Sequence, residues 1–306
     1  MDDYLIFKGD ENMSKSVGAF LVMISAAMWG ISGVFGQFLF EHYHPDPVWL
    51  ILVRQLAAGI LFLLYSALKG EPVLKLWNSG RGNVKEMLWF TLGLLGAQFL
   101  FYYTISIANA PTATVLQYEA PIFIILWQAF RSHRMPEKRE LLGVILAVTG
   151  VFLISTHGDP AHLVISPMAL FTGELSAIAL AIYTVAPVNI LKQFSTMLIM
   201  GWGQLISSLF LMPFCNLSAS GVEAWDLPSI ASMAYIILGG TLIPFTLFLV
   251  GVKIIGPARS SLISCFEPLA SIVCTVLFLG TQLLPPDYAG MACIIITVLM
   301  LAIQKK

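Results

Sequence analysis

A chain of 306 residues that is 58% hydrophobic and only 11% charged does not have the composition of a soluble globular domain, because such domains carry about 25% charged residues. The net charge of −1 gives no indication of a charged partner. The four cysteines have no metal-ligand spacing and are interpreted as small apolar residues. We therefore expect a membrane protein with no metal site and no cofactor.

Ten apolar runs follow one another along the chain, each roughly as long as a helix that crosses a hydrocarbon core of ~30 Å. The connections between them are too short for a separate soluble domain, so the function must lie among the helices or in short loops. The predicted spans are residues 17–40, 47–68, 86–108, 112–130, 140–155, 168–191, 194–214, 229–252, 258–279 and 287–303.

The Lys and Arg residues predict how these spans are oriented. Of the 16 Lys and Arg residues, all except Arg54 lie at the two termini or in every second connection between spans. Basic residues stay on the cytoplasmic side of a membrane. The pattern therefore predicts ten crossings, with both termini in the cytoplasm, in a multi-pass protein of the plasma or inner membrane.

A weak internal repeat divides the chain into two halves of five spans. With an offset of 147 residues, Gly93 aligns with Gly240, Phe101 with Phe248, Pro121 with Pro268, and Gly143 with Gly290. Five is an odd number, so the second half must be inverted, and inverted repeats are typical of secondary transporters. The predicted division is a tail (1–16), a first repeat (17–155), an outside linker (156–167) and a second repeat (168–303).

Three motifs resemble the drug/metabolite transporter superfamily, in particular its EamA-type members. They are SAAMWGISGVFGQ (25–37), IANAPTATVLQYEAPIFIIL (107–126) and GPARSSLISCFEPLASIV (256–273). The resemblance covers residues 17–303. It implies a transporter of small organic solutes that works by alternating access. The segment TATVLQY is most similar to a branch associated with amino acids, amines and carboxylates, so an amino-acid or metabolite exporter is expected.

Ionisable residues inside the spans are candidate site residues, because charges in a bilayer are costly. Arg54, Glu119 and Glu174 lie six or seven residues from the predicted outer ends of their spans, about 10 Å deep at 1.5 Å per residue. Three interpretations stay open, and the first two do not exclude each other. Arg54 pairs with one of the acids to lock helices together, or it binds a solute carboxylate while an acid holds an amine or a coupling proton, or its side chain extends toward the membrane interface.

Further polar and aromatic residues are predicted to line the cavity. Tyr102 lies at a depth similar to that of Arg54. Glu267 is either hydrogen-bonded to freed backbone or a protonatable coupling acid. Pro121 and Pro268 are expected to kink their helices. The remaining cavity candidates lie nearer mid-depth and are Trp29, Gln98, Tyr183 and Gln204.

Enzymatic function is not indicated by any motif. The sequence Gly30-Ile31-Ser32-Gly33 matches the GxSG of rhomboid-type intramembrane proteases, but that chemistry needs a His base, and no predicted span contains a His. The chain has neither a phosphate loop nor an HExxH motif.

The expected partners are a small organic solute, the lipid bilayer and protons as a candidate coupling ion. The alternative is a lipid scramblase or a sensor on the same scaffold.

Overall fold

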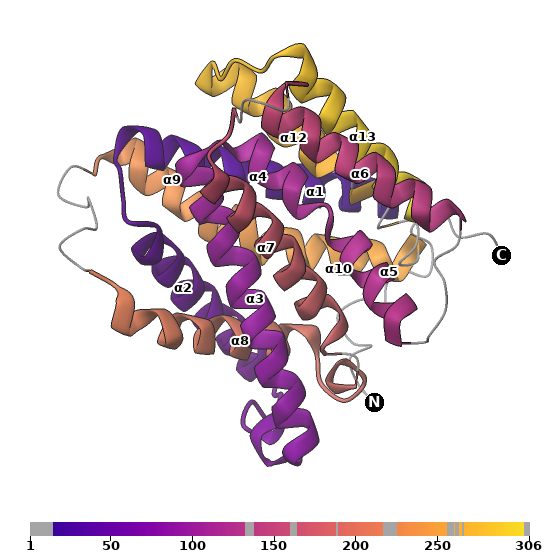
Figure 1. Cartoon of the computed structure of the whole chain (residues 1–306). Helices are drawn as coiled ribbons and strands as arrows, with labels where there is room; N and C mark the ends of the chain where they lie inside the picture. Colours follow the sequence, from indigo (N-terminus) through magenta and orange to yellow (C-terminus); the bar gives the residue numbers. More distant parts are fainter. Residues whose placement is uncertain are drawn as a thin grey trace.

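The computed structural model of the chain is an assembly of packed helices (Figure 1). It describes residues 15–131, 138–159, 164–187, 189–216, 225–255, 260, 263–264 and 266–302. Within these residues, every regular element is a helix. Six helices are long and apolar enough to cross a membrane, and two shorter apolar helices accompany them. The prediction of an all-α membrane protein is thus confirmed, while the number of ten spans, the inversion of the repeat and the side of the termini stay predictions.

The helices of the first half follow the predicted spans closely at the start of the chain. The span predicted at 47–68 has the bounds of α2, and the one predicted at 86–108 begins five residues after α3 does. The elements are α1 (Lys15–His42), α2 (Pro47–Leu68), η1 (Lys75–Asn78), α3 (Arg81–Ile107), α4 (Ala110–Gln117), α5 (Ala120–Arg131) and α6 (Lys138–Thr156).

The second half contains two short π-helical turns, η6 and η7, inside longer helical segments. The elements are α7 (Pro167–Val185), η2 (Ile190–Lys192), α8 (Thr196–Leu211), η3 (Met212–Phe214), α9 (Leu227–Ile237), η6 (Leu238–Leu242), α10 (Ile243–Ile255), α12 (Phe266–Cys274), η7 (Thr275–Leu279) and α13 (Pro285–Ala302). The predicted start of the ninth span, residue 258, lies outside the described residues.

Proline accounts for two of the differences between the predicted spans and the helices. The helix α7 ends at Val185, six residues before the predicted end at 191, because Pro187 disfavours helical backbone in the residue before it. The span predicted at 112–130 is interrupted at Tyr118 and Glu119. Directly after this break, Pro121 lacks the N–H that would bond to the carbonyl of Gln117 in a continuous helix.

Side-chain caps fix where several helices begin. Each capping side chain accepts a hydrogen bond from a backbone N–H of the first helical turn, and a proline at the first or second helical position often accompanies it. The capping residues are Asp46 for α2, Asn109 for α4, Ser166 for α7, Ser195 for α8 and Asp226 for α9.

Helices from the two halves of the chain pack against each other. The pairs α3 with α7, α2 with α8, α6 with α13, and α1 with both α10 and α12 lie side by side (Figure 1). Gly59 allows α2 to lie close to α8, since a Cβ there would be 2.7 Å from the backbone nitrogen of Leu205. Small residues at close helix crossings are typical of membrane proteins.

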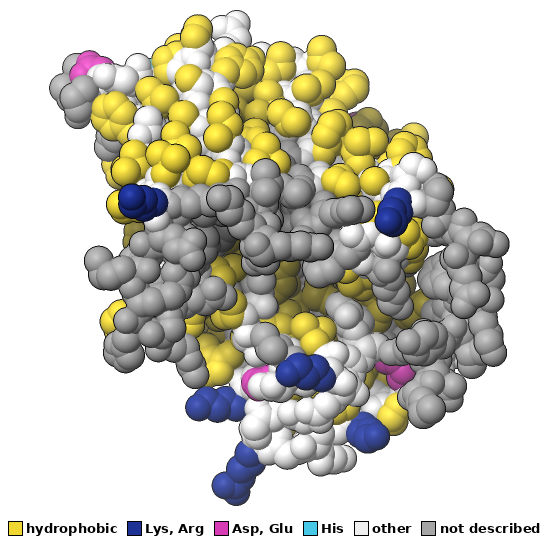
Figure 2. Space-filling model, turned by 90° about the vertical axis from the view of Figure 1, so that its right-hand side faces the viewer, with side chains coloured by type: hydrophobic (Ala, Val, Ile, Leu, Met, Phe, Trp, Pro, Cys, Tyr) yellow, Lys and Arg dark blue, Asp and Glu magenta, His cyan; other side chains and the backbone are white. Residues whose placement is uncertain are grey.

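Hydrophobic side chains are also exposed on the outer surface. On the face shown in Figure 2 they cover the upper part of the molecule, and Lys and Arg side chains lie below it. On α7 the exposed side chains recur every three or four residues, at Met168, Phe171, Leu175 and Ile178. One helix face is therefore apolar and unburied, as expected for a surface that contacts lipid.

Candidate functional site

Arg54 is a buried cation inside α2, with 7% of its surface exposed. Its Nε donates a hydrogen bond to Thr241 Oγ1 at 3.1 Å, and one terminal nitrogen donates to the Gly240 carbonyl at 3.4 Å. The guanidinium carbon lies 4.9 Å from the centre of the Tyr102 ring, a cation–π contact. In the part of the chain that the structure describes, no ion pair joins Arg54 to a carboxylate. Its charge is compensated there by neutral groups alone.

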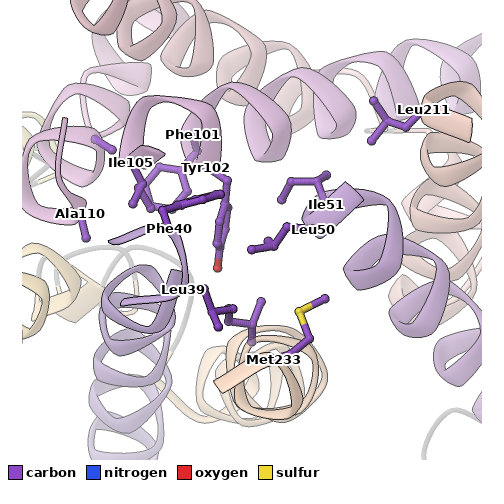
Figure 3. Close-up of a cluster of buried hydrophobic side chains, with 12 residues drawn as sticks. Leu39, Phe40, Leu50, Ile51, Phe101, Tyr102, Ile105, Ala110, Leu211 and Met233 are labelled. Carbon is purple, nitrogen blue, oxygen red and sulfur yellow. The ribbon is translucent and has the colours of Figure 1, made fainter. Parts of the chain in front are cut away.

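Tyr102 places an aromatic ring and a hydroxyl beside Arg54. Only 1% of its surface is exposed, and it belongs to a buried cluster formed by α1, α2, α3, α4, α8 and α9 (Figure 3). Its hydroxyl lies 3.0 Å from Ser32 Oγ and donates to the Ser32 carbonyl at 3.2 Å. Tyr102 therefore connects α3 to α1 at the level of the guanidinium.

The π-helical turn η6 supplies the other contacts of Arg54. Thr241 Oγ1, which accepts from Arg54, itself donates to the carbonyl of Ile236. Gly240 has no room for a side chain, because Ser32 occupies the position that a Cβ would take. Such π turns within helices are frequent at functional sites. Helices α1, α2, α3 and the α9–α10 segment thus converge on one polar centre.

Two glutamines extend this polar centre along the bundle, and a third lies buried on α8. Gln55 follows Arg54 in α2 and donates to Gln98 at 3.4 Å. Gln98 lies one helical turn before Tyr102, on the same face of α3. Gln204 on α8 is fully buried, and neither its side-chain oxygen nor its nitrogen has a hydrogen-bond partner. An unpartnered buried amide is costly, so these groups suit a polar ligand.

Two predicted cavity residues pack against aromatic rings instead. The Trp29 ring lies 5.1 Å from Phe245 and 5.4 Å from Phe248, both on α10. The Tyr183 ring lies 5.7 Å from that of Phe90. In this conformation the structure brings neither residue into contact with Arg54.

Glu119 and Glu174 form a separate acidic pair. Glu119 lies in the break between α4 and α5 with 7% of its surface exposed, and Glu174 lies on α7. The two carboxyl groups interact with each other, and each keeps a buried oxygen without a hydrogen-bond donor. Of the interpretations left open by the sequence, the ion pair of Arg54 with either acid is absent from this conformation.

Glu267 has a hydroxyl partner from the first half of the chain. Tyr118, in the break beside Glu119, donates to Glu267 Oε2 at 3.0 Å and to the Ser264 carbonyl at 2.6 Å. Pro268 is the third residue of α12, and residues 261–262 and 265, just before this helix, lie outside the described part of the chain.

Sequence reasoning missed four residues of these contacts: Ser32, Gln55, Tyr118 and Thr241. Each is an uncharged residue, and such residues are too common in membrane helices to stand out. A weak signal existed, since three of them are neighbours in sequence of Arg54, Glu119 or the repeated Gly240, and Ser32 lies between Gly30 and Gly33.

Apolar helices of membrane-spanning length around a buried polar centre are the features of a multi-pass membrane transport protein. The model of the EamA-like transporter family matches residues 16–156 and again residues 167–303. The chain therefore belongs to the EamA-like transporter family, within the drug/metabolite transporter superfamily.

Several relatives carry transporter names. The chain is 32% identical over 298 residues to the uncharacterized inner membrane transporter YicL of Salmonella typhimurium, covering 96% of this chain and 97% of the relative. It is 25% identical over 210 residues to the threonine/homoserine exporter RhtA of Escherichia coli, covering 68% of each chain. A solved crystal structure covers 94% of this chain with a TM-score of 0.60 and 16% identity, a likeness in fold alone.

Proposed function

We propose that this transporter exports amino acids or closely related metabolites, and that Arg54 binds the carboxylate of the solute. The single observation that carries the proposal is the buried guanidinium without a carboxylate partner among the described residues. Leaving a buried charge unpaired is strongly unfavourable, and an arginine fork matches the two oxygens of a carboxylate. A solute carboxylate would supply the missing negative charge.

Unpartnered carboxamides on the packed helices α2 and α8 suit the rest of an amino acid. Gln55 Oε1 and Gln204 Oε1 are buried acceptors without donors, and an ammonium group offers three donors. RhtA, similar to this chain over about two thirds of its length, is named for threonine and homoserine, which both carry a carboxylate and an ammonium group. The named substrate class of the relative and the polar groups of this site therefore support the same proposal.

Alternating access is the proposed mechanism, with ten spans in two inverted repeats and both termini in the cytoplasm. Helix packing supports the repeat: with the offset of 147 residues, the pair α3 and α7 corresponds to the pair α10 and α1, and both pairs are in contact. The distribution of Lys and Arg supports the orientation. Inverted halves can exchange shapes and open a shared site to either side in turn.

Solute binding can act on the fold through Arg54, because this residue holds the π turn η6. A carboxylate that attracts the guanidinium competes with the Gly240 carbonyl and Thr241 Oγ1 for its N–H groups. Loss of these bonds frees the α9–α10 segment from α2. In the proposal, this release starts the change from one open side to the other. The coupling ion is proposed to be the proton.

Export by cells that overproduce the protein tests the proposal. Metabolites in the medium are compared among the wild type, Arg54→Ala, Arg54→Lys and the control Arg81→Ala, which removes an exposed arginine at the start of α3. We expect the wild type and the control to enrich one class of amino acids. Arg54→Ala should lower export at least tenfold, since a charged hydrogen bond contributes about 1.5–3 kcal/mol. Arg54→Lys, which keeps the charge without the fork, should be intermediate.

Normal export by correctly inserted Arg54→Ala would contradict the role of Arg54. If the wild type enriches no solute, the exporter fails, and a scramblase that moves labelled lipids without solute flux becomes the better explanation.

A further inference from the structure

The strongest unexplained feature outside the arginine centre is the contact between two acids, Glu119 and Glu174. Glu119 is more than nine-tenths buried, and one oxygen of each carboxyl group is buried without a donor. Two ionised carboxylates in contact repel each other strongly where the dielectric constant is low. A single proton between them removes the repulsion and gives both oxygens a hydrogen-bond partner.

The surrounding helices hold the two acids together. Ala120 of α5 packs with Ala177 and Ala181 of α7, and small side chains allow close helix contact. Glu119 itself lies in the break between α4 and α5, where its backbone N–H donates to Leu116 instead of continuing the regular hydrogen bonds of a helix. The acids therefore meet at a junction between a packed helix, α7, and a segment interrupted at that point.

Other ionisable groups on the packed helices have partners elsewhere. Tyr102 contacts Ser32 and Arg54, Tyr118 contacts Glu267, the Tyr103 ring packs on Phe99, and Tyr183 packs on Phe90. Glu86 bonds to Asn189, and Arg81 and Lys85 lie exposed in the first turns of α3. No cation from α3, α4 or α7 is thus placed to neutralise the acids within the described residues.

We propose that Glu119 and Glu174 form a proton-binding site, in which one proton bridges the two carboxyl groups while α5 packs on α7 and leaves when these helices separate. The inference rests on the proposed export function and assigns its coupling ion to a site apart from Arg54. Only the proton is exchanged with water, and no other bond forms or breaks. After the proton has left, both carboxyl groups are ionised. Their repulsion favours the state in which α5 and α7 are separated.

Helix α3 connects the proton site to the solute site. Tyr102 contacts Arg54 on one side of α3. Two residues further along, Thr104 Oγ1 lies 2.8 Å from Thr172 Oγ1 on α7, and Thr172 is two residues before Glu174. A shift of α3 on solute binding is therefore transmitted to α7, so the two binding events become linked.

Infrared spectroscopy of the full-length protein in liposomes tests the site without any solute. The measured quantity is the band of protonated carboxyl groups in the wild type, Glu119→Gln, Glu174→Gln and the double variant. We expect the double variant to lose the signal of about one protonated carboxyl group per protein. Glu267→Gln serves as a comparison for another buried acid, and it should leave the signal of the pair in place. A double variant with the complete wild-type signal would overturn the proposal.

Proteoliposomes test the coupling. Counterflow of L-threonine and of the other standard amino acids is measured without a pH gradient, and uptake is then measured with one. In both single variants, we expect the ratio of gradient-driven flux to counterflow to fall at least tenfold. The matched control Glu71→Gln removes an acid outside the spans and keeps an acceptor for Ser195, so its ratio should equal that of the wild type.

Different results would contradict the amino-acid transport function and the proton site. Absence of counterflow in the wild type would contradict amino-acid transport, while the infrared result would still decide whether the pair holds a proton. Wild-type uptake that does not respond to the pH gradient, or single variants with the wild-type ratio, would overturn the assignment of the coupling ion to this pair.

Discussion

The junction of α5 with α7 and the junction of α12 with α1 are related by the 147-residue offset, yet they treat a buried acid in different ways. At the first junction, Glu119 meets a second acid, Glu174. At the second, Glu267 accepts a hydrogen bond from the hydroxyl of Tyr118. An acid with a hydroxyl donor is satisfied without a further ligand, whereas two acids in contact need a proton. The comparison indicates a structural role at one junction and a ligand-dependent role at the other.

The two junctions also differ in how closely the helices approach. With the same offset, Gly30 of α1 corresponds to Ala177 of α7. Ala177 is completely buried with its methyl group in place. A Cβ on Gly30 would instead contact the carbonyl of Glu267 and lie 2.9 Å from the backbone nitrogen of Ser271. The glycine thus allows backbone-to-backbone contact at the second junction, and the alanine keeps the first junction slightly wider.

The substitution Gly30→Ala should disrupt the junction of α12 with α1 and cause the largest loss of stability. Its methyl group meets backbone, which cannot move aside as a flexible side chain would, so we expect a loss of stability on the order of 3 kcal/mol. The measurement is the thermal unfolding of the purified protein in detergent, together with export.

The matched change Ala177→Gly should cost only about 1 kcal/mol, the difference in helix propensity between the two residues. Equal stability of Gly30→Ala and the wild type would show that α1 and α12 are not in backbone contact.

The variant Tyr118→Phe tests the different roles of the two junctions, and its expected effect on stability is smaller. It leaves the carboxyl group of Glu267 and the carbonyl of Ser264 without this donor, and an unsatisfied buried acceptor costs about 1–3 kcal/mol. The change should lower the unfolding temperature without altering the response of transport to a pH gradient. Glu267→Gln is the matched control, because its amide oxygen can still accept from Tyr118. A lost pH response in Tyr118→Phe would move the coupling site to the second junction.

The sequence was sufficient to predict where the helices lie but not how they contact one another. Apolar runs and basic connections predicted α1 and α2 to within two residues of their ends, because the length of a spanning helix is set by the bilayer. A kink at Pro121 was predicted, but the position of the break at Tyr118 and Glu119 and the π turn at Gly240 were missed. Both depend on whether backbone groups find partners in neighbouring helices, which hydropathy does not record.

The contact partners of the candidate site residues could not be predicted from the sequence for a related reason. Arg54 contacts Thr241, 187 residues away in sequence, and Tyr118 contacts Glu267, 149 residues away. Depth in the membrane correctly singled out Arg54, Glu119 and Glu174 as buried or partly buried groups. Depth could not decide which faces of the helices meet, so the sequence left the ion pair, the solute site and an orientation of Arg54 toward the membrane interface open as alternatives.

The contact between Tyr43 and Asp226 tests the same hydroxyl-to-carboxyl chemistry outside the spans, where the smallest effect is expected. Tyr43 donates to Asp226 Oδ1 at 2.6 Å and joins the end of α1 to the start of α9. This hydrogen bond lowers the pKa of Asp226, and the acceptance by Asp226 raises the pKa of Tyr43.

A lowered pKa of Asp226 means that the bond stabilises the fold above the ordinary aspartate value of about 3.9, and that this stabilisation is lost as the pH falls through the lowered pKa. A raised pKa of Tyr43 means that the stabilisation is present below the ordinary tyrosine value of about 10 and is lost as the pH rises through the raised one. The unfolding temperatures of the wild type and Tyr43→Phe should therefore differ slightly near neutral pH and converge at both extremes. A difference that persists in strong acid would assign the effect to packing of the Tyr43 ring on Phe38, which does not titrate. Because this hydrogen bond is exposed to water, which can replace either partner, the same pair of groups contributes less at this position than Tyr118 and Glu267 contribute inside the bundle.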